Sequence, residues 1–351
     1  MLDPEPEDRT EPFCPYYGTC GGCSLQHLGP DSYDAHKRAL VEEPLRRAHV
    51  AASLAAIIPA HGDGRRRATL HARGHAAGYM KARSHELLDI EACPILVPAL
   101  QSSAPIIARQ IGATIGDCDV ALTATATGLD IAIRTEKRGL KRERLTLLAQ
   151  RLDAARMTLN GDLVLEARPP TIRSGKADIA LPPASFLQAT ALAEETLASL
   201  VLTGLGKAKH VADLFCGVGP FALRIAERAR VFAVDADKPA IAALQNAVRH
   251  TQGLKPVRAI ARDLFREPLY TVELDDFDAV IFDPPRAGAE AQSRELARSK
   301  VKTVIAVSCE PKTFARDAAI LIAGGYRLET LTPVDQFAWS NHIELVGVFR
   351  R

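Results

Sequence analysis

Strands and helices alternate along the C-terminal half of the chain, and this pattern constrains the fold more than any other feature. After a helical segment that begins near residue 185, four apolar stretches of strand length are each followed by a stretch of helical spacing; they are residues 211–215, 231–235, 278–283 and 304–309. Strands separated by helices pair in parallel, because the connection must cross the sheet. The sequence therefore predicts a parallel α/β sheet over residues 185–351, with a closing strand pair at residues 327–337 and 342–350.

The N-terminal half has a different pattern, in which short alternating strands run from about residue 65 to 180 with one helix near residues 98–111. This pattern is typical of a small α+β module. We therefore expect a flexible acidic tail over 1–13, an α+β domain over 14–184 and a catalytic domain over 185–351. A helix expected over about residues 32–54 is free to pack on the catalytic domain.

Composition excludes several classes of protein. Hydrophobic residues make up 47% and charged residues 25% of the chain, which is ordinary for a soluble globular protein. No run approaches the roughly 18 apolar residues that a membrane helix needs, and the acidic start does not resemble a signal peptide. We expect a cytoplasmic protein with no membrane contact, and no obligate protein partner is evident.

A glycine turn follows the first strand of the predicted sheet. Gly217 and Gly219 allow the backbone to turn sharply and approach a ligand, although such glycines also fit a nicotinamide or flavin site. Two carboxylates favour S-adenosylmethionine. Asp213 can face a cationic amino-acid group, and Asp235 can accept hydrogen bonds from ribose hydroxyls, unless it serves only as a helix N-cap.

The next strand ends in a rigid Asp283-Pro284-Pro285 loop. Two prolines prevent an immediate helix, so the Asp283 carboxylate stays at the carboxyl edge of the sheet, where open α/β sheets bind ligands. Related loops in amino-group methyltransferases have an aromatic residue after the prolines. Arg286 stands there instead, which disfavours amino-group methylation.

Cys309 ends another strand, and Pro311 begins the following helix. A helix N-terminus lowers the pKa of a thiol, so Cys309 is a candidate nucleophile, the alternative being a buried structural thiol. Thiolate addition at C6 of uracil makes C5 nucleophilic enough to take up a methyl group. A base must then remove the C5 proton, and Glu344 is the candidate, unless it is a surface residue on an edge strand.

Four cysteines form a possible metal site. Cys14, Cys20 and Cys23 are close in sequence, and Cys93 lies far downstream. Four thiolates suit an iron–sulfur cluster or a structural zinc, and the spacing does not separate the two; unrelated buried cysteines are the third interpretation. The remaining Cys118 and Cys216 are expected to be packing residues.

Positive charge is concentrated in the middle of the chain, although the net charge is only +2. The arginine triplet 65–67 and the basic segment 134–144 suit a polyanion such as RNA, while a merely solvated face is the alternative.

Four ordered motifs, DLFCGVGPF (213–221), DPPRAG (283–288), SCEPKTFARD (308–317) and HIE (342–344), resemble the uracil-C5 RNA methyltransferase family. The resemblance implies a class I (Rossmann-like) S-adenosylmethionine methyltransferase domain beside a smaller α+β domain with a cysteine-ligated cluster. It makes Cys309 the covalent nucleophile and Glu344 the base. It further implies a cofactor site lined by Gln188, Phe215, Asp235, Asp263 and Asp283.

Within this family, branches that act on 23S ribosomal RNA carry a [4Fe-4S] cluster on such cysteines, whereas the transfer-RNA branch generally lacks it. Only 13 residues precede Cys14, so we expect the N-terminal TRAM-type barrel of many relatives to be absent. The resemblance therefore predicts methylation of C5 of a uridine in 23S ribosomal RNA. The alternatives are the same chemistry on transfer RNA, or an idle RNA-binding or redox-sensing homologue.

Overall fold

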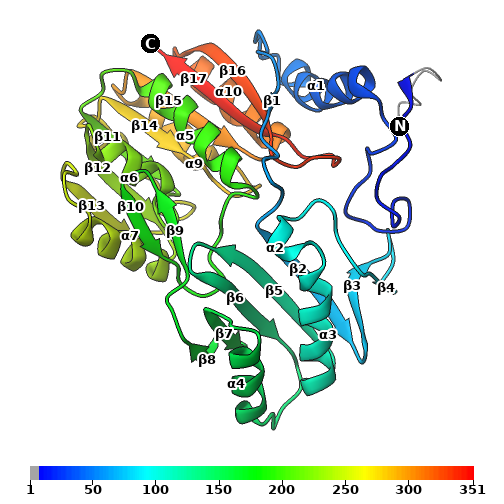
Figure 1. The fold of residues 1–351 in the computed structure, drawn as a ribbon. Helices are drawn as coiled ribbons and strands as arrows, with labels where there is room; N and C mark the ends of the chain where they lie inside the picture. The colour runs from blue at the N-terminus through cyan, green and yellow to red at the C-terminus, as the bar shows by residue number, and fades with distance from the viewer. Residues whose placement is uncertain (1–7) are drawn as a thin grey trace.

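Residues 8–351, which the computed structural model describes, form two large β-sheets that lie beside one another (Figure 1). The larger has eight strands in the order β1-β16-β17-β15-β14-β11-β12-β13. These strands are β11 (His210–Leu214), β12 (Arg230–Asp235), β13 (Val257–Ala261), β14 (Ala279–Phe282), β15 (Thr303–Ser308), β16 (Arg327–Asp335), β17 (Glu344–Arg350) and β1 (Ile58–Pro59). Strands β11–β15 pair in parallel, and β17 is antiparallel to both β15 and β16. The parallel sheet predicted from the strand–helix alternation is confirmed.

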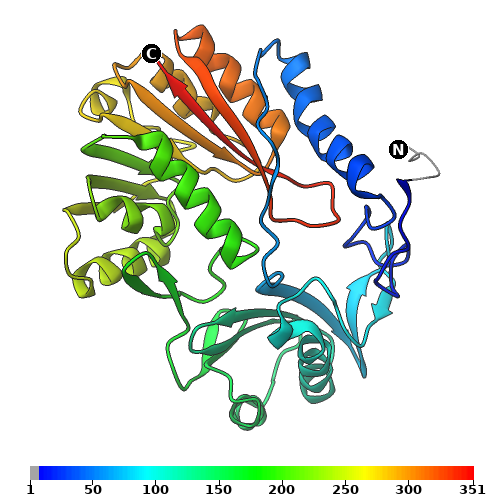
Figure 2. The ribbon, with the colours of Figure 1, turned by 45° about the horizontal axis from the view of Figure 1, so that its top comes forward.

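Helices cover both faces of this sheet, which is why strands β14 and β15 are buried along their whole length. One face is covered by α5 (Ala191–Leu205), α6 (Pro220–Ala226) and α7 (Lys238–His250). The other is covered by α8 (Thr271–Leu274), α9 (Glu290–Arg298), α10 (Pro311–Ala323) and α1 (Pro30–Arg47). Helix α1 lies along α10, as Figure 2 shows.

The smaller sheet has seven strands within the described residues, in the order β4-β3-β2-β5-β6-β7-β8. Its elements are β2 (Arg67–Arg73), β3 (Ala76–Met80), β4 (Leu87–Asp89), β5 (Cys118–Thr125), β6 (Gly128–Arg134), β7 (Arg156–Leu159), β8 (Asp162–Glu166), α2 (Pro98–Gln101), α3 (Ser103–Ile115) and α4 (Arg142–Arg151). Helices α3 and α4 share its apolar core. The sequence analysis predicts only the helix near residues 98–111 in this region, so helix α4 was not predicted.

Core packing assigns some segments differently from the sequence analysis, which places all of residues 14–184 in one domain. The hairpin of β9 (Thr171–Ser174) and β10 (Ala177–Ala180) buries apolar side chains in the core of the larger sheet, and β10 contacts α7. Strand β1 also pairs with β16 of the larger sheet. Helix α1 packs on the larger sheet, as the sequence analysis allowed for this helix. Hydrophobic periodicity is a local feature, so it cannot predict contacts between segments that lie far apart in the sequence.

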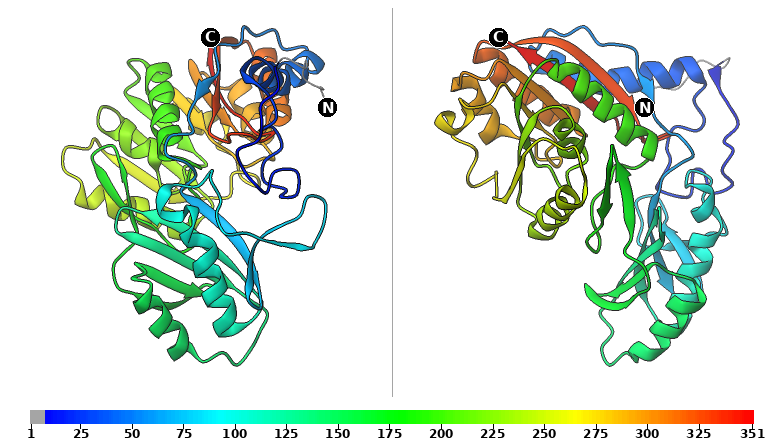
Figure 3. Two further views of the ribbon diagram at one scale, coloured as in Figure 1. Left: turned by 45° about the vertical axis from the view of Figure 1, so that its right-hand side comes forward. Right: turned by 60° about the vertical axis from the view of Figure 1, so that its left-hand side comes forward.

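The segment before α1 connects the two sheets (Figure 3). Cys20 pairs with Lys81 just after β3, while the backbone amides of Ser24 and Leu25 donate to the carbonyl of Trp339, between β16 and β17. Residues 1–7 of the expected flexible tail lie outside the described residues. Asp8, however, accepts a hydrogen bond from the Ser32 amide in the first turn of α1 at 2.6 Å, so the rest of that tail contacts the fold. No helix in residues 8–351 has the length and apolarity needed to cross a membrane.

Candidate active site

A cavity of about 550 Å³ opens at the carboxyl ends of the parallel strands. Both candidate catalytic residues and most of the candidate cofactor residues line it: Gln188, Phe215, Gly217, Asp235, Asp263, Asp283, Cys309 and Glu344. The other two candidates are Gly219 and Asp213. Gly219 is favoured by its backbone, since its φ of +85° strains any other residue; a Cβ there would also lie 2.4 Å from a methyl carbon of Leu244 in α7. Asp213 is fully buried in β11.

The turn after β11 is held by Asp235 at the end of β12. One carboxylate oxygen of Asp235 accepts from the Gly217 amide and the other from the Asp237 amide, both at 2.8 Å. Helix α7 is capped by Asp237, whose side chain accepts from the Ala240 amide. Asp235 is therefore not the N-cap, and it faces the cavity.

Three carboxyl groups lie in or beneath this cavity: Asp213 and Glu344 are buried, and Asp283 is half-buried. Burial, then the charge of Asp283, raises the pKa of Asp213 to about 8, and burial raises the pKa of Asp283 to about 7. Burial and Asp283 also raise the pKa of Glu344 to about 8. Neither oxygen of Asp213 makes a hydrogen bond of ordinary geometry within the described chain. A buried carboxyl group without a hydrogen-bond donor favours a cationic ligand nearby, because the cation would offset the repulsion between Asp213 and Asp283.

The thiol of Cys309 differs from its expected state. Burial, followed by the charges of Glu344 and Asp283, raises its pKa to about 11, while Arg286 and a backbone hydrogen bond at Cys309 act in the opposite direction. The expectation of a lowered pKa is wrong for the ligand-free site. Burial, together with the carboxylates at two other strand ends, outweighs the N-terminus of α10, and no local sequence pattern shows this burial or this convergence.

Glu344 begins β17, opposite Val334 of β16, and is only 3% exposed. Since β17 lies between β15 and β16, the edge-strand alternative for Glu344 is wrong. Its carboxylate accepts from Gln336 Nε2 at 2.9 Å, and the same nitrogen donates to Gln188 Oε1 at 2.7 Å. Sequence reasoning missed Gln336. The available signal was that this residue directly follows the strand before the HIE motif, so it lies at the same end of the sheet as Glu344.

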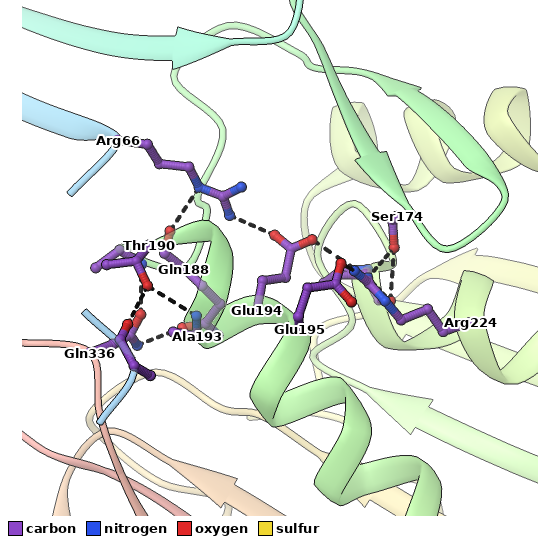
Figure 4. Close-up of polar contacts among 12 residues, drawn as sticks. Arg66, Ser174, Gln188, Thr190, Ala193, Glu194, Glu195, Arg224 and Gln336 are labelled. Carbon is purple, nitrogen blue, oxygen red and sulfur yellow. Dashed lines mark hydrogen bonds and ion pairs between the residues drawn. The ribbon is translucent and has the colours of Figure 1, made fainter. Parts of the chain in front are cut away.

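The arginine triplet is not an exposed basic patch, because its central member is buried and the other two are only partly exposed. Arg66 is 9% exposed, donates to the Gln188 carbonyl at 3.0 Å and pairs with Glu194 of α5 at 2.5 Å. Arg224 of α6 contacts the other oxygen of Glu194 (Figure 4). Burial also lowers the pKa of Arg67. The buried Arg66–Glu194–Arg224 group instead connects the residue just before β2 of the smaller sheet with helices α5 and α6, which pack on the larger sheet.

The four candidate metal-binding cysteines line a second cavity of about 460 Å³ together with Tyr79 and Arg65; they are Cys14, Cys20, Cys23 and Cys93. All seven cysteines are unpaired thiols. Burial raises the pKa of Cys93 to about 11, and the nearby thiols of Cys23 and Cys20 raise it further. Within residues 8–351, no group of three or more His, Cys, Asp or Glu side chains is placed to hold a metal ion. The four cysteines thus line one cavity, but their side chains are not arranged as metal ligands.

The fold and the cavity at its strand ends define an α/β methyltransferase. The structure is similar to that of the Pyrococcus abyssi tRNA (uracil-54, C5)-methyltransferase in complex with S-adenosyl-L-homocysteine, with a TM-score of 0.74 and 22% identity over 95% of this chain and 86% of that one.

Sequence comparisons identify the family. The family model described as tRNA (Uracil-5-)-methyltransferase matches residues 140–351. An uncharacterized RNA methyltransferase of Brucella melitensis is 47% identical over 100% of this chain and 86% of its own. The 23S rRNA (uracil(1939)-C(5))-methyltransferase RlmD of Chromohalobacter salexigens is 34% identical over 98% of this chain and 77% of its own. The chain belongs to the RNA uracil-5-methyltransferase family, and it is an S-adenosylmethionine-dependent RNA methyltransferase.

Proposed function

We propose that this enzyme methylates C5 of a uridine in 23S ribosomal RNA, with Cys309 as covalent nucleophile and Glu344 as base. The observation that carries the proposal is their shared cavity. Cys309 leaves β15 and Glu344 begins β17, and both line it with six of the candidate cofactor residues. An idle homologue would have no need to keep a thiol and a buried carboxyl group together beside a methyl-donor site.

The cavity suits S-adenosylmethionine, which supplies an electrophilic methyl group when bound. Its sulfonium and ammonium groups are cations, and a cation would favour the ionised forms of the buried Asp213 and the half-buried Asp283, whose pKa values are both raised. Asp235 keeps acceptor capacity for ribose hydroxyls, since each of its oxygens accepts one backbone hydrogen bond. Gln188 is fixed beside Asp283, to which it donates at 3.2 Å.

The residues of the chain then divide the chemistry. Cys309 loses its proton more readily once a cation in the cavity offsets the charges of Asp283 and Glu344. The thiolate adds to C6, the C5–C6 double bond opens, and C5 takes up the methyl group. Glu344 removes the C5 proton, the double bond re-forms, and the sulfur leaves C6. The pKa of about 8 matches a base that works near neutral pH.

Two observations favour 23S ribosomal RNA over transfer RNA as substrate. A relative at 34% identity is named for that substrate, and the four cysteines gather at one cavity. The transfer-RNA alternative is supported by the name of the matching family model. Because Arg66 is buried and Arg65 and Arg67 are only partly exposed, RNA contact falls mainly to the exposed cations of the segment 134–144: Arg134, Lys137, Arg138, Lys141, Arg142 and Arg144.

We also propose that the four cysteines hold a [4Fe-4S] cluster. Thiols are its usual ligands, and Arg65, which lines the same cavity, has a buried guanidinium nitrogen without a hydrogen-bond partner in the described chain. That charge would compensate the negative charge of a thiolate-ligated cluster. The cytoplasmic location stays a prediction.

The test compares ribosomal and transfer RNA from cells with the enzyme, without it, and with Cys309→Ala. Mass spectrometric mapping is expected to show one 5-methyluridine in 23S ribosomal RNA that disappears in the latter two strains. Loss of the methyl group from transfer RNA would support the alternative substrate, and unchanged RNA would contradict the proposed function.

A further inference from the structure

We propose that Gln336 is a positioning residue that holds Glu344 ready to remove the C5 proton and ties it to the cofactor side of the cavity through Gln188. The inference rests on the proposed function and adds a residue that none of the sequence motifs contains. Loss of the Gln336 amide is expected to slow proton removal much more than methyl transfer.

Gln336 belongs to a small hydrogen-bonded network, and Figure 4 shows it beside Gln188. It is 1% exposed and directly follows β16. Its amide nitrogen donates to Glu344 Oε1 at 2.9 Å and to Gln188 Oε1 at 2.7 Å. Gln188 in turn donates to Asp283 at 3.2 Å. One amide group therefore connects the candidate base with the candidate cofactor residues.

The orientation of this amide follows from its surroundings. The backbone N–H of Ala189 lies 2.7 Å from Gln336 Oε1, and an N–H needs an acceptor, so the oxygen must be on that side. The NH₂ group must then face Gln188 and Glu344. Gln188 uses its own NH₂ toward Asp283, which leaves its oxygen to accept from Gln336.

The backbone around Gln336 is fixed by helix α1. The preceding Asp335 is buried and accepts from Lys37 Nζ at 2.8 Å and from Tyr33 Oη at 2.5 Å. Lys37, which is fully buried, also donates to the carbonyl of the following Phe337 at 3.2 Å. The residues on either side of Gln336 are therefore held in place, and its amide has little freedom to leave Glu344.

This contact matters because the other surroundings of Glu344 oppose a carboxylate. Burial and the charge of Asp283 favour its protonated form, and the neighbouring Cys309 adds negative charge whenever it is a thiolate. Gln336 provides the one side-chain hydrogen bond to Glu344 in the described chain. Without that donor, the group would hold its proton more tightly and lose its orientation.

The experiment measures two steps of a single turnover with labelled methyl donor: formation of the methylated covalent adduct and release of methylated RNA. For Gln336→Met we expect nearly unchanged adduct formation and release slowed about 10- to 100-fold, the effect of one hydrogen bond to a charged group. The adduct should accumulate, and release should recover as the pH is raised. The matched control is Gln292→Met, because Gln292 is equally buried but bonds only to the backbone of Leu269.

Equal slowing of both steps, or release at the wild-type rate, would overturn the inference. Should Gln336→Met fail to fold, Gln336→Asn replaces it, since the shorter amide cannot reach both partners and should slow release alike. Glu344→Gln is measured in parallel. If that variant does not accumulate the adduct, the proposed function fails; if it does and the Gln336 variants do not, only this inference fails.

Discussion

The reactivity of Cys309 measures the effect of the two carboxyl groups that face it. Its pKa of about 11, against an ordinary 9.0, lowers the thiolate fraction at pH 7.5 by about 100-fold, from roughly 3% to roughly 0.03%. Glu344→Gln removes one of the negative charges, so it should lower the pKa of the thiol. We expect alkylation of Cys309 to become up to about tenfold faster above pH 8, where the wild-type Glu344 carboxyl is ionised, and no more than this because burial and Asp283 still act.

The assay follows iodoacetamide labelling of the Cys309 peptide by mass spectrometry between pH 7 and 11. The control is Asp317→Asn, which removes a buried carboxyl group of α10 that accepts from the Ala289 amide. It should leave the labelling of Cys309 unchanged. The reasoning is refuted if the wild-type thiol titrates at or below pH 9, or if Glu344→Gln and Asp317→Asn label at the wild-type rate.

The remaining predictions concern stability, RNA binding and the cysteines. Arg66→Ala should lower the free energy of unfolding in denaturant by about 3 kcal/mol, since it leaves the buried Glu194 carboxylate partly unpaired. An unchanged unfolding midpoint would contradict this. The same variant should leave the salt dependence of RNA binding unchanged. Replacing Arg138 and Lys141 by Ala should reduce the log–log salt slope by about 0.7 to 0.9 for each phosphate that the protein no longer neutralises, whereas an unaltered slope would identify a merely solvated face. Lys37→Met should cost about 3 to 5 kcal/mol by breaking a buried ion pair, measured in the same unfolding assay. Cys20→Ser in anaerobically purified protein should remove iron and visible absorption, and stoichiometric zinc without iron in the wild type would refute the cluster.

Sequence reasoning located the site because its chemistry lies at strand ends. Asp283 and Cys309 each follow an apolar stretch, and parallel strands bring their carboxyl ends to one edge of the sheet. Each of these features is local in the chain, so the pattern of residues contains it.

The missed features depend on contacts between distant segments. Gln336 and Gln188 are 148 residues apart, and Arg66 and Glu194 are 128 apart. The charge on Arg66 suggested an exposed residue, but burial follows from the partner and not from the residue type. The raised pKa of Cys309 has the same origin, because both its burial and the nearby carboxylates come from segments distant in the sequence.

The central claim is a covalent uracil mechanism divided between Cys309 and Glu344, and its most direct measurement is a denaturing gel of enzyme incubated with RNA and labelled S-adenosylmethionine. Glu344→Gln should yield a shifted protein–RNA band that carries the labelled methyl group, because the thiolate adds and methylation proceeds while the C5 proton stays. Cys309→Ala should give neither band nor methylated RNA, and the double variant should give no band. Methylation by Cys309→Ala would contradict the thiolate mechanism, and a methylated adduct that accumulates in Asp283→Asn but not in Glu344→Gln would assign the base to Asp283.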